Sequence, residues 1–119
     1  MGVFEEAFTS TANIMSTSSL SSFGYVVKAA KTEVLSITAT NINASARYLR
    51  LYNTSSTVDP VTYTAVFKAA IPTASTFTWA PITPMTFSDG LVVIATSTGA
   101  EATGGSPTAG NVFCSIQYN

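Results

Sequence analysis

Residues 47–67 read RYLRLYNTSSTVDPVTYTAVF, and they contain two β-strand patterns on either side of a polar turn. In the first pattern Leu49 and Leu51 alternate with tyrosine and arginine, which is the two-residue period of an extended chain with one buried face. The segment from Asn53 to Pro60 is rich in Ser, Thr, Asp and Pro, which favour turns. Alternation then resumes over residues 62–68. The stretch therefore predicts strand, loop and strand, and the rest of the chain must supply strands that pair with these two.

The composition predicts one domain with its own core. A chain of 119 residues with 46% hydrophobic residues can bury enough apolar surface to fold without covalent staples. Its single cysteine, Cys114, excludes an intrachain disulfide, so synthesis in a reducing cytoplasm is expected.

Charge is scarce in this sequence. Only 9% of the residues are charged, against about 25% in ordinary globular domains, whereas Ser and Thr make up 34 of the 119 residues. A hydroxyl-rich surface with few charges resists association poorly, which favours a protein partly covered in a larger assembly; the β-propensity of threonine is the alternative explanation. With five Lys and Arg residues and no apolar run of about 20 residues, neither a nucleic acid nor a membrane is an expected partner.

Further strands are expected at residues 24–29, 32–42, 91–96 and 112–118. In the second of these, Leu35, Ile37 and Ala39 share one side of the strand, and the third is expected to be buried on both faces. Residues 77–87 are apolar but broken by two prolines, which indicates an edge strand or an ordered loop that covers one end of the core with Trp79 and Phe87. A tight turn is expected at Ser88-Asp89-Gly90. These short strands predict an all-β fold, an antiparallel β-sandwich of plain or jelly-roll type. The expected core includes Leu49, Leu51, Phe67, Val93 and Ile116.

Residues 1–23 are interpreted as an extended N-terminal arm that precedes a β-sandwich domain of residues 24–119. The arm is rich in Ser and Thr but dotted with large apolar residues, too many for a purely solvated tail. It either lies along its own domain or reaches a neighbouring subunit. The predicted interface residues are Phe4, Phe8, Ile14, Met15, Leu20 and Phe23 of the arm, together with Trp79.

The sequence contains no pattern typical of a catalytic, cofactor or metal site. Histidine is absent, which removes the commonest general base and nitrogen ligand. Cys114 stands inside an apolar strand pattern, where a buried and unreactive thiol is expected. A carboxylate pair of Asp59 with Asp89 stays open, although each residue suits a turn. The Tyr and Trp side chains fit either a sugar-stacking platform or a protein interface.

Several short motifs occur in a recognisable order. They are YLRLYN at residues 48–53, DPV at 59–61, FSDGL at 87–91 with Ala95-Thr96 after it, a Gly/Ala-rich loop, and IQY at 116–118. In this order and spacing, residues 45–119 resemble small all-β virion proteins of tailed bacteriophages. The resemblance implies a non-enzymatic component of the particle, since some such proteins act as cement or decoration proteins on the capsid.

The resemblance and the low charge together predict a capsid cement or decoration protein that bridges neighbouring shell subunits. It would be made in the bacterial cytoplasm, form a homo-oligomer with a trimer as the favoured form, and bind the major capsid protein or another virion protein on the capsid surface. The alternative is a tail or head-to-tail component, including a receptor-binding module that uses exposed Tyr and Trp on carbohydrate. An enzyme is the third and least favoured interpretation.

Overall fold

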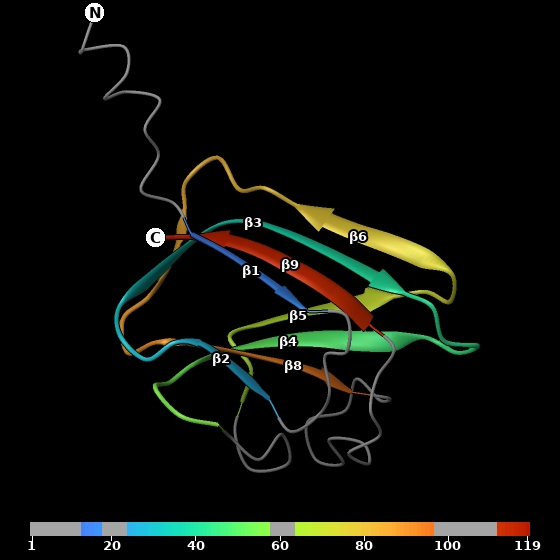
Figure 1. Cartoon of the computed structure of the whole chain (residues 1–119), viewed down its shortest axis with the longest axis horizontal. Coiled ribbons are helices and arrows are strands. Elements are labelled where there is room, and N and C mark those ends of the chain that lie inside the picture. The colour runs from blue at the N-terminus through green and yellow to red at the C-terminus, as the bar shows by residue number, and fades with distance from the viewer. Residues whose placement is uncertain (1–12, 18–23, 58–63, 97–111) are drawn as a thin grey trace, which may run out of the picture.

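The computed structural model describes residues 13–17, 24–57, 64–96 and 112–119, and these residues form nine β-strands and no helix (Figure 1). The strands are β1 (Asn13–Thr17), β2 (Tyr25–Lys28), β3 (Thr32–Asn41), β4 (Arg47–Asn53), β5 (Phe67–Ile71), β6 (Ser75–Trp79), β7 (Met85–Phe87), β8 (Leu91–Thr96) and β9 (Val112–Tyr118). The all-β prediction is therefore confirmed, and the strand predicted at residues 112–118 has the observed bounds.

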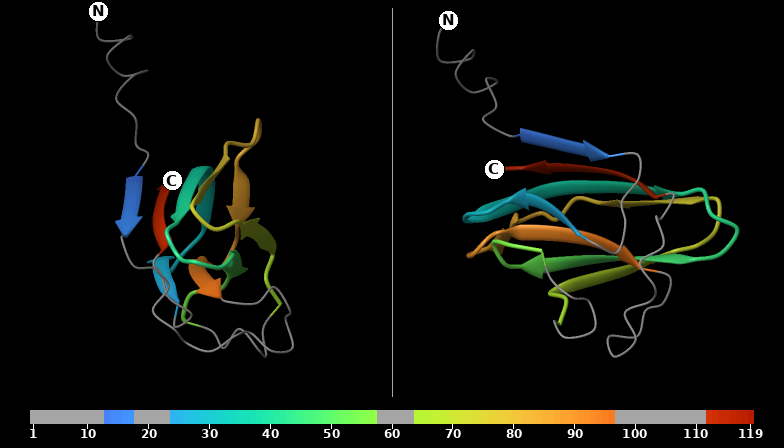
Figure 2. Two further views of the ribbon diagram at one scale, coloured as in Figure 1. Left: turned by 90° about the vertical axis from the view of Figure 1, so that its right-hand side faces the viewer. Right: turned by 60° about the horizontal axis from the view of Figure 1, so that its bottom comes forward.

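The strands form two antiparallel sheets that pack against each other in two layers (Figure 2). Sheet A has the order β1-β9-β3-β6, and β7 pairs with another part of β3. Sheet B has the order β2-β8-β4-β5. Side chains from both sheets, including Ile37 and Ile116 from sheet A and Leu51 and Val93 from sheet B, form one buried core between the layers.

Strand β4 lies inside sheet B, between β8 and β5, and both of its faces are covered. Leu49 and Leu51 point into the core and are fully buried, as predicted. Arg50 and Tyr52 lie on the other side of the strand, also as predicted, but they are buried too. The expectation of a half-exposed strand was wrong because Tyr52 packs in a second apolar cluster with residues of β8.

Strand β8 is buried along its whole length, as its unbroken apolar sequence predicted. Val93 packs in the core, whereas Val92 and Ile94 belong to the second cluster on the outer side of sheet B. Phe67 on β5 packs against the core but stays partly exposed, so its predicted place in the core is only partly realised.

Strand β3 departs from the simple alternation that its sequence suggests. Ile37 and Ala39 are buried as predicted, but Val34 fills the next inward place and Leu35 is only half-buried. The cause is a β-bulge, because the pairing with β9 shifts register between Val34 and Ser36. A bulge inserts one extra residue into the strand. The residues that point inward are therefore even-numbered before the bulge and odd-numbered after it.

The proline-broken stretch forms two short strands, β6 and β7, at the edge of sheet A. Both pair with β3, and the five residues 80–84 between them stand opposite only Leu35 and Ser36. Pro81 and Pro84 lie in this insert, where a missing N–H breaks no pairing. The predicted edge strand is thus confirmed.

The two aromatic residues expected to cover the core at this edge do so to different degrees. Phe87 is fully buried, while Trp79 is half-buried and stacks on Phe67 with ring centroids 4.8 Å apart. The insert between their strands presents Ile82 to solvent.

The turn predicted at Ser88-Asp89-Gly90 is present and is tied to the end of β4. The Asn53 side-chain oxygen accepts a hydrogen bond from the Asp89 N–H at 2.8 Å, and its Nδ2 donates to the Ser88 hydroxyl at 3.1 Å. The Thr54 N–H donates to the Gly90 carbonyl at 3.1 Å, and Gly90 has a φ of +148°. The glycine is required here because the chain passes very close to two other backbone segments.

Part of the expected arm belongs to the folded body. Strand β1 pairs antiparallel with β9 at the edge of sheet A, in a continuous register from Asn13 opposite Tyr118 to Thr17 opposite Cys114. This segment therefore lies along its own domain, which was one of the two arrangements considered for the arm. Residues 1–12 and 18–23 lie outside the described residues.

Candidate functional surface

The outer face of sheet A carries an array of hydroxyl groups, which we call the hydroxyl face. Strand registers align Ser16, Ser115, Thr38 and Thr78 across β1, β9, β3 and β6, and they align Phe113, Thr40 and Thr76 in the next row. The array arises because outward positions recur every second residue and threonine or serine occupies most of them. No side chain in the two rows is ionisable.

The polar groups of the hydroxyl face interact with one another as well as with solvent. The Thr40 and Thr76 hydroxyls are 2.9 Å apart across β3 and β6. One row away, the Ser36 hydroxyl donates to the Gln117 side-chain oxygen at 3.4 Å. Hydroxyls both donate and accept hydrogen bonds, so such a surface can match the backbone or neutral side chains of a partner without a net charge.

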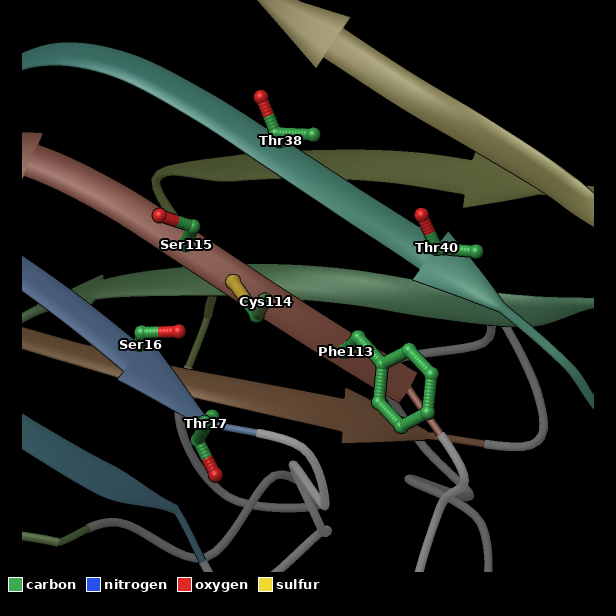
Figure 3. A pocket seen from close by; sticks show the side chains of 7 residues that line it. All are labelled: Ser16, Thr17, Thr38, Thr40, Phe113, Cys114 and Ser115. Carbon is green, nitrogen blue, oxygen red and sulfur yellow. The ribbon is translucent and has the colours of Figure 1, made fainter.

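A shallow depression of about 130 Å³ lies on this face (Figure 3). Its lining comes from β1, β3 and β9 and consists of Ser16, Thr17, Thr38, Thr40, Phe113, Cys114 and Ser115. The Phe113 ring stands at one end of the depression and is 44% exposed. Because ligand pockets usually enclose about 300 to 1,000 Å³, this hollow suits surface recognition better than an enclosed ligand. The described residues that line it offer hydrogen bonds and one aromatic contact.

Cys114 contributes to the floor of the depression, but its thiol is buried. Burial raises the pKa of the Cys114 thiol from its usual 9.0 to about 12, because the thiolate would lose its hydration. The predicted unreactive role agrees with this placement, since only the thiolate is a strong nucleophile.

We therefore expect the folded protein at pH 8 to resist alkylation at Cys114, and the urea-unfolded protein to react at once. Mass spectrometry after a timed iodoacetamide pulse measures the labelling. Labelling of the folded protein as fast as that of the unfolded protein would show that the thiol is accessible.

The raised pKa of the Cys114 thiol also predicts a pH effect on stability. Below about pH 9 the thiol is protonated in both the folded and the unfolded protein. Above about pH 9 the thiol of the unfolded chain ionises first, so the free energy of unfolding falls as the pH rises toward 12.

The predicted interface residues fall in different environments. Ile14 is 71% exposed on the outer side of β1, beside Gln117. Met15 was expected at an interface, but its side chain is 5% exposed and packs in the core of its own chain, because the alternation of β1 turns it inward. Trp79 also packs against this core. Phe4, Phe8, Leu20 and Phe23 lie outside the described residues.

Two of the aromatic residues considered for a sugar-stacking platform are at least partly buried. Tyr52 is buried on the outer side of sheet B, and Trp79 packs between the sheets against Phe67. The residue that sequence reasoning missed is Phe113, whose ring is exposed among hydroxyls. The available signal was the repeat of polar residues at every second position in β3, β6 and β9.

No group of three or more His, Cys, Asp or Glu side chains that could hold a metal ion occurs among the described residues. Asp89 lies at the exposed turn before β8, whereas Asp59, its suggested carboxylate partner, falls outside the described ranges. Within the part of the chain that the structure describes, no helix is long and apolar enough to cross a bilayer.

Comparisons with known proteins found no matching family model, no matching curated protein and no matching solved structure. Function is therefore inferred from the chemistry of the hydroxyl face, the order of the strands and the resemblance in residues 45–119.

Proposed function

We propose that this chain is a non-enzymatic structural protein of a bacteriophage virion, a cement or decoration protein that binds the outer capsid shell and stabilises it. Two observations support the proposal together, the strand order of the two sheets and the resemblance in residues 45–119. The partner would be the major capsid protein or another virion protein, and the protein would act as a homo-oligomer on the capsid surface.

The strand order supports a jelly roll as the finer description of the fold. If β6 and β7 count as one edge strand interrupted by residues 80–84, the sheets read β1-β9-β3-β6 and β2-β8-β4-β5. The chain then changes sheet at nearly every connection and ends beside its first strand, as two Greek keys rolled into an antiparallel sandwich do. Jelly rolls are common in viral capsid domains and in lectins. Because a fold alone does not define a function, the resemblance in residues 45–119 is what favours the virion.

The surface chemistry supports attachment to a protein shell. The hydroxyl face spans four of the five strands of sheet A and carries no ionisable side chain in its two rows. Threonine and serine can donate to and accept from the carbonyl and amide groups of a partner. Attachment through such a face would depend little on salt, because no screened charge pairs hold it.

Electron microscopy of the particles that contain the protein tests the proposal directly. We expect density for this fold at regular positions over the shell. Co-sedimentation with shells that lack the protein should show binding, and the loaded shells should withstand heating better than bare ones. Copies confined to one vertex or to the tail would overturn the decoration role.

A substitution on the hydroxyl face tests whether that face makes the attachment. Thr38→Arg places a bulky charge in the centre of the array, and Thr57→Arg makes the same change at an exposed site outside the sheets. We expect Thr38→Arg to abolish co-sedimentation and Thr57→Arg to leave it intact. Equal binding by both variants would show that the attachment is made by another part of the molecule, such as residues 1–12.

The alternative is a tail or head-to-tail component that binds carbohydrate. The exposed Phe113 ring beside a hydroxyl-lined depression favours it, since sugars stack on aromatic rings and bond to polar groups. Glycan binding that is lost in Phe113→Ala, with no attachment to shells, would support this alternative.

A further inference from the structure

Each sheet has two edge strands, and three of these four edges are protected against pairing with another chain. Strand β2 carries a bulge between Val26 and Lys28, and the lysine itself stands on the edge. Strand β5 presents Lys68 at an exposed position. The β6–β7 edge is interrupted by the insert of residues 80–84 with its two prolines. Bulges, lysines and prolines are the devices that keep sheet edges from associating.

The fourth edge, β1, has none of these devices. Its sequence, Asn-Ile-Met-Ser-Thr, contains no charge and no proline, and its pairing with β9 runs without a bulge. Among the described residues, no strand pairs with the open side of β1. Its backbone therefore offers N–H and C=O groups that a further strand can use.

The side of the molecule that contains β1 also exposes large apolar side chains. Strands β1 and β2 end sheets A and B on the same side, opposite β5 and β6 (Figure 2). Ile14 on β1 is 71% exposed, and Tyr25 and Val26 on β2 are 43% and 37% exposed. Large apolar side chains next to an unprotected edge are typical of a surface that another chain covers.

We infer that β1 is a self-association edge that pairs antiparallel with β1 of a second copy of this chain. A two-fold axis brings identical residues together, and every side chain of β1 is neutral, so no like charges meet. With the axis at Met15, each Ile14 lies opposite Ser16 of the second copy on the outer face, and both Met15 side chains stay turned toward the cores. Sheet A and its hydroxyl face then continue from one protomer into the other.

This contact gives a two-fold pair in place of the trimer expected from the sequence. Five paired residues bury less than the about 800 Å² per partner of a standard interface, so the association is weak and depends on concentration. The inference does not depend on the proposed virion role, because it concerns the isolated protein.

Sedimentation of the full chain over a concentration series tests the pairing. We expect the mass to rise toward two protomers. Ile14→Lys, which places a charge at the exposed edge, should raise the dissociation constant by about tenfold or more, since the two lysines then lie diagonally across the pair on the same face of the sheet. Ile82→Lys is the matched control, because it makes the same change at an exposed residue of the opposite edge. It should associate as the parent does.

Hydrogen exchange of the backbone amides distinguishes edge pairing from contact through side chains alone. The amides of Asn13–Thr17 that face the open edge should exchange more slowly as the protein concentration rises. Circular dichroism is the folding control, and it should show that each variant is folded. Ser16→Lys replaces Ile14→Lys if the latter unfolds. Four results would overturn the inference. Sedimentation could show a mass of three protomers or a monomer at every concentration. Ile14→Lys and Ile82→Lys could weaken the association equally, or the exchange of the β1 amides could be independent of concentration.

Discussion

Replacing Gly90 with alanine is expected to lower the free energy of unfolding by about 2 to 6 kcal/mol. A Cβ at this position would lie 2.5 Å from the Thr54 carbonyl oxygen and 2.7 Å from the Lys28 carbonyl oxygen. Both atoms belong to the backbone, so no side-chain rotation can relieve the contact. The φ of +148° adds strain that glycine alone avoids. Strained backbone and overpacking each cost about 1 to 3 kcal/mol, which gives the range.

Urea unfolding followed by circular dichroism measures this effect. Since small domains are stable by only about 5 to 15 kcal/mol, we expect the Gly90→Ala midpoint to fall sharply, or the variant to be unfolded in buffer. Asp89→Ala is the control, because Asp89 is exposed and engages the turn through its backbone N–H. Its midpoint should stay near that of the parent. A Gly90→Ala variant as stable as Asp89→Ala would mean that β2 and the end of β4 lie farther from the turn.

The strands were predictable where one alternating pattern runs without interruption. In β9, Val112, Cys114 and Ile116 point inward, as their two-residue period indicates. In β8, an unbroken apolar run indicates burial on both faces, which the structure confirms. Each of these signals is local, since the period of the strand and the polarity of its neighbours decide which way the side chains turn.

The departures come from pairing, which a single strand pattern does not contain. At the bulge in β3 the pairing with β9 shifts register, and Val34 takes the inward position that was expected for Leu35. Met15 was assigned to an interface because it is one of the large apolar residues dotted through a Ser- and Thr-rich segment, yet pairing with β9 turns it into the core. Burial of Tyr52 depends on a second cluster outside sheet B, which alternation alone does not predict.

The hydroxyl face was only partly predictable. The excess of Thr and Ser is evident in the composition, but their alignment into rows depends on the registers of β1, β9, β3 and β6. A threonine on an outward position looks the same in sequence whether it faces solvent or a partner. The depression beside Phe113 likewise needs three strands that are distant in sequence to lie next to one another.

Replacing Leu51 with alanine is expected to lower the free energy of unfolding by about 2 to 5 kcal/mol. Leu51 is fully buried, and the register places it between Phe67 on β5 and Val93 on β8. Alanine removes its apolar contacts and leaves a cavity. The backbone of β4 is paired with a strand on each side, so it cannot move inward to fill the space. The cost should therefore include both the lost burial and the cavity.

Urea unfolding of Leu51→Ala should show a lower midpoint with an unchanged slope, because the surface exposed on unfolding hardly changes. Ile82→Ala is the matched control, since it removes a similar aliphatic side chain from a fully exposed position, and it should shift the free energy by no more than about 0.5 kcal/mol. The difference between the two variants isolates the contribution of burial. Midpoints that agree for Leu51→Ala and Ile82→Ala would show that Leu51 is not inside, and the register of β4 between β5 and β8 would then be wrong.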